Sequence, residues 1–238
     1  MDFLHYTFSS IGGRRINEDS YYLSEYNGGI IAVVADGLGG YSAGKIASKM
    51  VISVLQNEVK NNDKIDLTNI VKTANSKILE MQDRSGLKMK TTAAIVLVDS
   101  NCTSLLNIGD TRIYLFKNNR IVFQSIDHSV AQIRIMAGEL SYDQLRFSKD
   151  RNVLTKVLGD NEDIYTSITL IKNETFDSVL ICTDGLWEYV YEEEMCSAKA
   201  QNDSPSQWIN QLIKIRETRA PIENDNYTAI AIIKKQEG

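Results

Sequence analysis

The segment IIAVVADGLGG, residues 30–40, joins a short apolar run to a glycine-rich turn that opens on a carboxylate. Residues 30–35 are all apolar and mostly β-branched, and they are too few to span a bilayer, so they predict a buried strand. Asp36 follows at the end of this strand, and the glycines after it allow the backbone to approach a ligand closely. The segment therefore predicts a core strand with a metal-binding carboxylate at its end.

Other carboxylates occupy similar positions along the chain. Asp184 follows the apolar run 179–183, and Asp225 precedes the run 227–233. Without a cluster of histidines or cysteines, these acids favour hard cations such as Mg²⁺ or Mn²⁺ over zinc. Taken singly, an Asp-Gly pair after a strand is more often an ordinary turn. Three further acids lie in the polar stretches RRINED and GDTR: Glu18, Asp19 and Asp110.

The remaining pattern predicts an α+β fold with antiparallel sheets. Strands and helices do not alternate regularly, which disfavours a doubly wound parallel sheet. Runs rich in β-branched residues and bounded by Gly, Asp or Asn predict strands at 93–98, 113–116, 121–124, 178–183 and 228–233. Helical spacing predicts helices at 43–58, at 67–82, at 129–137 and after Pro205.

Apolar spacing also predicts which faces of the first two helices are buried. The polar segment 139–151 is expected to form a surface flap, Trp187 is interpreted as a core aromatic, and residues 192–194 as a solvated acidic turn. The expected buried residues are Ile46, Met50, Val54 and Leu55 in the first helix, and Ile70, Ala74, Ile78 and Met81 in the second.

Composition limits the class of protein. The 238 residues, 43% of them hydrophobic, are interpreted as one domain, residues 1–238. A net charge of −5 without a basic stripe argues against a nucleic-acid partner. Three scattered cysteines predict reduced thiols rather than disulfides, and no signal peptide or membrane span is recognisable, so we expect a cytoplasmic protein.

Six motifs in one order make the acidic residues more informative together than singly. RRINED, DGLGGYSAGKIAS, GDTR, NVLTKVLG, TDGLWE and NDNYT cover almost the whole chain. In this order they resemble the type 2C (PPM) metal-dependent protein phosphatases, and most closely their compact bacterial members. The resemblance implies a four-layer α-β-β-α sandwich, in which two antiparallel sheets are flanked by helix pairs.

The resemblance also implies a metal centre with two core ions, Mn²⁺ or Mg²⁺. Asp36 would bridge the two ions with help from the Gly37 carbonyl, and Asp184 and Asp225 would hold one of them; these three aspartates are the expected catalytic residues. Glu18 and Asp19 would contribute directly or through water. Asp110 would form a weaker third site with Asp184.

By the same resemblance, a hydroxide bridging the ions would hydrolyse phosphoserine and phosphothreonine on proteins. Arg14 is the expected fork for the substrate phosphate, because a guanidinium binds phosphate oxygens bidentately, and Arg15 is interpreted as a surface charge. Many eukaryotic members carry a histidine where this chain has Leu38, so no general acid is identified. His128 is interpreted as structural.

The expected partners are phosphoprotein substrates and an opposing serine/threonine kinase, and we expect a monomer. Two other functions fit parts of the pattern. One is an inactive PPM-fold module that binds phosphoproteins or a kinase without turnover. The other is an unrelated calcium-stabilised β-sandwich. Neither requires Arg14 together with the ordered aspartates, and metal-dependent turnover of a phosphomonoester separates all three functions.

Overall fold

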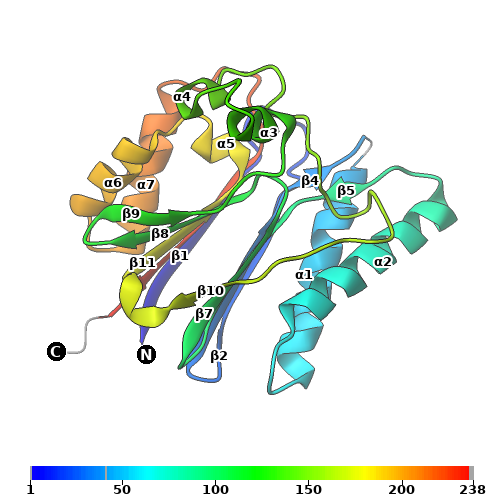
Figure 1. Ribbon diagram of the computed structural model, residues 1–238, viewed down its shortest axis with the longest axis horizontal. Helices are drawn as coiled ribbons and strands as arrows, with labels where there is room; N and C mark the ends of the chain where they lie inside the picture. Colours follow the sequence, from blue (N-terminus) through cyan, green and yellow to red (C-terminus); the bar gives the residue numbers. More distant parts are fainter. Residues whose placement is uncertain (1, 41, 236–238) are drawn as a thin grey trace.

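Two five-stranded antiparallel sheets lie face to face, and each is covered on its outer side by a pair of helices (Figure 1). The computed structural model describes residues 2–40 and 42–235. The predicted four-layer α+β sandwich is confirmed. The first sheet has the strand order β1 (Phe3–Ser10), β12 (Tyr227–Lys234), β11 (Ser178–Cys182), β8 (Arg112–Lys117), β9 (Arg120–Gln124). The second sheet has the strand order β10 (Thr169–Lys172), β7 (Cys102–Ile108), β6 (Ala93–Val98), β3 (Gly29–Ala35), β2 (Ser20–Tyr26).

The helices form the outer layers and one end of the sandwich. No helix in the described part of the chain is both long and apolar enough to cross a membrane. A two-stranded sheet, β4 (Gly37–Leu38) with β5 (Lys90–Thr91), lies beside the second sheet. The pair α1 (Ala43–Asn61) and α2 (Leu67–Ser85) covers the second sheet, and α6 (Glu192–Ala200) and α7 (Pro205–Glu217) cover the first. At one end of the sandwich lie α3 (Val130–Met136), α4 (Tyr142–Leu145) and α5 (Asp184–Trp187). A 3₁₀ turn at Asn173–Thr175, after β10, lies at the opposite end.

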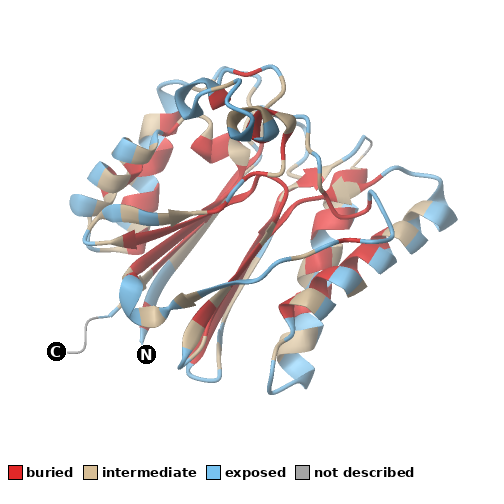
Figure 2. Cartoon of the chain, in the orientation of Figure 1, coloured by how far each residue is buried: buried red, intermediate tan, exposed pale blue. Residues whose placement is uncertain are grey.

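Strand β3 shows why the run 30–35 is apolar without interruption. Its even-numbered residues pack against the other sheet, whereas its odd-numbered residues pack against α1 and α2. Every residue of the strand is buried (Figure 2). Because successive side chains of a strand point to opposite faces, burial on both faces requires a continuous apolar run.

The predicted helix faces were wrong at two positions. Ile46 is 40% exposed and Met81 is 37% exposed. The buried stripe of α1 instead starts with Ala43, Gly44 and Ala47, and these small residues allow the helix to approach β4 closely. A bulky Ile46 side chain is better accommodated facing solvent.

The acidic stretch 192–194 was predicted as a turn but forms the start of α6. Negative side chains near a helix N-terminus interact favourably with the helix dipole. The Glu194 side chain also accepts a hydrogen bond from the Tyr191 backbone N–H, which is one half of a capping box. These acids therefore stabilise a helix rather than end one.

The segment 139–151 contains α4 and contacts the helices at the end of the sandwich. Leu145 is buried, and the Arg146 guanidinium donates to the carbonyl oxygens of Trp187 and Val190. These contacts anchor the segment at its centre. Its role as a flap stays a prediction.

The close approach of α1 to β4 leads to a first prediction. A Cβ added at Gly44 would lie 2.5 Å from the Gly37 carbonyl carbon, whereas one added at Gly40 would meet nothing within 4 Å. Gly44→Ala should therefore lower the free energy of unfolding by about 1–3 kcal/mol through overpacking, and Gly40→Ala should have little effect. Urea denaturation of the two variants measures this, and equal midpoints would contradict the predicted contact.

Candidate active site

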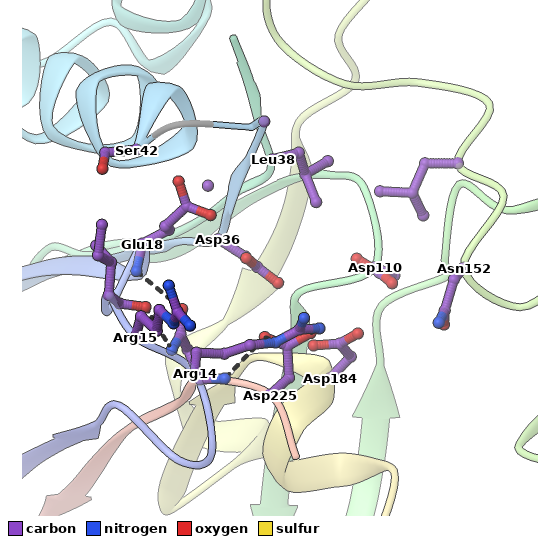
Figure 3. Close-up of a pocket in the computed structure, with 15 residues that line it drawn as sticks. Arg14, Arg15, Glu18, Asp36, Leu38, Ser42, Asp110, Asn152, Asp184 and Asp225 are labelled. Atoms are coloured by element: carbon purple, nitrogen blue, oxygen red, sulfur yellow. Dashed lines mark hydrogen bonds and ion pairs between the residues drawn. The ribbon is translucent and has the colours of Figure 1, made fainter. Parts of the chain in front are cut away.

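A cavity of about 790 Å³ opens at the end of the sandwich where the two sheets meet the connecting loops. Its walls bring together side chains from distant parts of the sequence (Figure 3). Of the predicted site residues, only Asp19 is not on its wall. The predicted residues on the wall are Arg14, Glu18, Asp36, Gly37, Asp110, Asp184 and Asp225, and they are joined there by Arg15, Ile16, Leu38, Asn152, Leu154 and Asn226.

The backbone of Asp36 is fixed by two threonines at the start of the adjacent strand. The Asp36 N–H donates to Thr92 Oγ1 at 2.9 Å, and Thr91 Oγ1 donates to the Asp36 carbonyl oxygen at 2.7 Å. Both threonines are fully buried. The end of β3 is therefore held rigidly, while the Asp36 carboxylate faces the cavity.

Asp184 and Asp225 are brought together by the pairing of β11 with β12. These strands are antiparallel neighbours, so the end of β11 lies beside the start of β12. Asp184 is the first residue of α5 and is separated from the end of β11 by Thr183, and Asp225 is separated from the start of β12 by Asn226. The register of these two strands thus places both carboxylates at the same end of the sheet.

Asn226 organises the loop that carries Glu18, a role that the sequence reasoning missed. Its side-chain oxygen accepts from the Glu18 N–H at 2.8 Å, and its Nδ2 donates to the carbonyl oxygens of Ile11 and Ile16. The side chain is 5% exposed. The signal was present in the NDNYT motif, where only the aspartate had been given a role.

Burial and mutual repulsion raise the pKa values of four aspartates in this site. Burial, with Asp225 nearby, raises the pKa of Asp184 to about 6. Burial, with Asp184 nearby, raises the pKa of Asp19 to about 7. The pKa values of Asp36 and Asp110 are also raised, first by burial and then by neighbouring aspartates. The protein alone therefore does not neutralise this group of carboxylates.

Three oxygens of the acidic group have no hydrogen-bond donor among the described residues: Glu18 Oε1, Asp19 Oδ1 and Asp184 Oδ1. A buried carboxylate oxygen without a partner is costly, and a cation is the partner that fits an all-oxygen set. These residues therefore fit the divalent metals that the sequence predicted.

The acids do not yet form a closed ligand cage. Within residues 2–40 and 42–235, no group of three or more His, Cys, Asp or Glu side chains is arranged to hold a metal ion as it stands. One of the acids, Asp225, has a different partner.

That partner is Arg14, whose Nε and Nη2 donate to the two Asp225 carboxylate oxygens at 3.0 and 2.7 Å (Figure 3). The hydrogen bonds and charge of Asp225 raise the pKa of Arg14. The sequence reasoning expected Arg14 to bind phosphate and did not predict this pair. Both side chains remain substantially exposed, at 58% and 42%, so the pair is accessible to ligands that compete for either partner.

His128 has a structural contact. Its Nδ1 accepts a hydrogen bond from the Gly109 N–H at 3.2 Å. The backbone N–H of His128 donates to the Gly109 carbonyl oxygen. Burial, with Lys156 nearby, lowers the pKa of His128, which suits a neutral imidazole that accepts a hydrogen bond through Nδ1. His128 is not on the cavity wall, so it positions the turn before Asp110.

Comparison with known proteins places this site in a family. A family model described as protein phosphatase 2C matches residues 9–215. Serine/threonine phosphatase Stp of Listeria welshimeri is 29% identical over 192 residues, which cover 72% of this chain and 75% of that protein.

Solved structures share the fold. Serine/threonine phosphatase Stp1 from Staphylococcus aureus has a TM-score of 0.90 at 24% identity, with 99% of this chain and 96% of that chain covered. The catalytic domain of the phosphatase PstP, solved with two manganese ions, has a TM-score of 0.83 at 25% identity and 97% coverage of both chains. Since the family model spans most of the sequence, the chain belongs to the protein phosphatase 2C family of enzymes that its ordered motifs predicted.

Proposed function

We propose that this protein hydrolyses phosphoserine and phosphothreonine in other proteins with the help of two divalent cations, Mn²⁺ or Mg²⁺. The observation that carries the proposal is the group of carboxylates around one cavity, with three buried oxygens that lack a donor. The relatives named serine/threonine phosphatases support the substrate class. The manganese ions of PstP support the choice of metal.

The residues would divide between the ions as follows. Asp36, with the Gly37 carbonyl, would be shared by both core ions, and Asp184 and Asp225 would complete the set around one of them. Glu18 and the buried Asp19 would act directly or through water. Asp110 would join Asp184 at a weaker third site.

Bound there, the cations supply an acidified water as nucleophile and neutralise the phosphoryl oxygens. Arg14 would bind the substrate phosphate through its planar fork. In the structure this fork is paired with the Asp225 carboxylate, so Arg14 would have to exchange that carboxylate for the phosphate. Leu38 and Leu154 would limit the water around the phosphate from the cavity wall.

An inactive binding module finds no support, because Arg14, Asp36, Asp184 and Asp225 are all retained on one cavity wall. We further propose that the protein reverses the action of a serine/threonine kinase, as a cytoplasmic monomer. Among the described residues, the free cysteines Cys102, Cys182 and Cys196 agree with a reducing compartment.

Metal dependence is the direct test of the function. Release of phosphate from a phosphothreonine peptide should require Mn²⁺ or Mg²⁺ and stop in excess chelator. Asp36→Asn and Asp184→Asn should each lower kcat roughly hundredfold or more, because each removes a charged ligand of the metal centre. Asp203→Asn, in an exposed loop, is the control. Undiminished turnover in chelator would overturn the metal mechanism.

The role of Arg14 has a separate test. A charge-assisted contact to phosphate is worth about 1.5–3 kcal/mol, so Arg14→Ala should lower kcat/KM about tenfold to a hundredfold. Arg14→Lys should restore only part of this loss, because lysine lacks the planar fork. Mn²⁺ affinity should not fall in Arg14→Ala, since Asp225 loses a competing partner.

Arg84→Ala is the matched control, because Arg84 is an exposed helix residue paired only with Glu80. Inorganic phosphate should inhibit the Arg14→Ala variant more weakly than the wild type. Equal inhibition of both proteins, with equal kcat/KM, would restrict Arg14 to its ion pair with Asp225.

The raised pKa of Asp184, about 6 against an ordinary 3.8, predicts a pH effect on stability. Between pH 3.8 and pH about 6, Asp184 keeps its proton in the metal-free folded protein, whereas the same residue of the unfolded chain has released it. The contribution of Asp184 to stability therefore falls as pH rises. Asp184→Asn should therefore stabilise the metal-free protein little at pH about 4 and by about 1–3 kcal/mol at pH about 7.5. Urea denaturation in chelator at both pH values measures the difference, and a pH-independent difference would refute the shift.

A further inference from the structure

A single hydrogen bond connects the turn that carries Asp110 to the helix that carries Asp184. The Trp187 indole Nε1 donates to the Asp110 carbonyl oxygen at 2.9 Å. Asp184 and Trp187 are the first and last residues of α5, which is one helical turn. Figure 3 shows Asp110 and Asp184 on the same side of the cavity. The bond therefore spans the two elements that present these carboxylates.

The indole is itself held rigidly. The Arg112 guanidinium lies over the Trp187 ring, with its Cζ 3.6 Å from the ring centroid. Arg112 Nε and Nη2 donate to the two Asp127 carboxylate oxygens at 2.9 and 2.7 Å, and both side chains are nearly fully buried. A guanidinium fixed by a bidentate carboxylate cannot rotate away from the ring. On the backbone side, Arg146 Nε donates to the Trp187 carbonyl oxygen at 3.1 Å.

Other hydrogen bonds hold the residues before and after Asp110, which are Gly109 and Thr111. His128 bonds both backbone groups of Gly109, and Thr111 Oγ1 lies 2.6 Å from Thr92 Oγ1 in a buried hydrogen bond. Among the described residues, the Trp187 indole is the side chain that donates to the Asp110 carbonyl oxygen. This N–H therefore helps to hold the backbone that carries the Asp110 carboxylate.

The second tryptophan of the chain, Trp208, is a buried indole that has no contact with the described residues of the candidate metal site and carries Lys199 Nζ 5.8 Å from its ring centroid. Trp208 is fully buried and packs edge-on against Phe116 at 5.0 Å between centroids. Its Nε1 has no hydrogen-bond partner among the described residues. Trp187 is equally buried at 2% exposure, but its N–H has an acceptor at the metal-binding edge. The two tryptophans therefore differ in whether the indole N–H donates to a residue of the candidate metal site.

We propose that Trp187 is a positioning residue, whose indole N–H fixes Asp110 relative to Asp184 and thereby sets the affinity for the cation that these two carboxylates share. This inference rests on the proposed function, because it concerns the weaker third ion of the metal centre. It extends the interpretation of Trp187 as a core aromatic.

The test compares Trp187→Phe with Trp208→Phe. Both substitutions shorten a buried ring and remove its N–H, so both should lower stability. Only Trp187→Phe removes a bond to the metal-binding edge, and it should raise the Mn²⁺ concentration for half-maximal activity about tenfold, as losses of ligand-orienting contacts do. Asp110→Ala should shift the curve in the same direction. Calorimetric titration with Mn²⁺ should show the same loss of affinity without reference to turnover.

The outcomes separate this inference from the function on which it rests. A wild-type protein without Mn²⁺-dependent phosphate release would overturn both. A wild-type protein that needs Mn²⁺, with identical Mn²⁺ curves for the two Phe variants, would overturn only the role of Trp187. Intrinsic fluorescence adds a check, because Trp187 is the remaining tryptophan in Trp208→Phe and its emission should change as Mn²⁺ binds.

If Trp187→Phe does not fold, the indole is replaced by benzothienylalanine in the Trp208→Phe background. This analogue keeps the shape of the ring and substitutes sulfur for the N–H. Weaker Mn²⁺ binding would support the hydrogen bond as the cause. Unchanged Mn²⁺ binding would show that ring packing alone positions Asp110.

Discussion

Repulsion among buried carboxylates is the constraint on which the rest of this structure depends. Asp19, Asp36, Asp110 and Asp184 each have a raised pKa, for which burial is the first cause and neighbouring acids a further one. The chain holds several of them by bonding their backbones. Thr91 and Thr92 bind the backbone of Asp36, and Trp187 binds that of Asp110. This arrangement leaves carboxylate oxygens available for cations.

The sandwich provides the rigidity that such an arrangement requires. Strands β3 and β11, which end beside Asp36 and Asp184, are buried on both faces, as is most of β12, which begins beside Asp225. The two sheets share one apolar layer between them. Displacing any of these carboxylates would disturb close-packed side chains. The exception is Asp225, whose carboxylate lies at the open rim with Arg14. The site thus combines fixed acids at its floor with one exchangeable ion pair at its edge.

Strands with two buried faces were predicted best from the sequence, because they leave an uninterrupted apolar run. The predicted strand 93–98 coincides with β6, and the run 30–35 lies within β3. The edge strands β1 and β2 were not predicted, since many of their residues face solvent and interrupt the pattern. Helix faces were predicted less accurately, because close packing on β4 favours small residues that periodicity does not weight.

The four layers were expected only from the resemblance to the type 2C phosphatases. By itself, the sequence determined the α+β class, the strands with two buried faces and the acids beside their ends. These follow from burial and turn chemistry, which act between near neighbours and leave a local pattern. Only the tertiary structure decided the partners of the site. Arg14 meets Asp225 across 211 positions, and Trp187 meets Asp110 across 77. Such contacts depend on sheet register and on how the layers pack, and residues far apart in the chain carry no local signal of either.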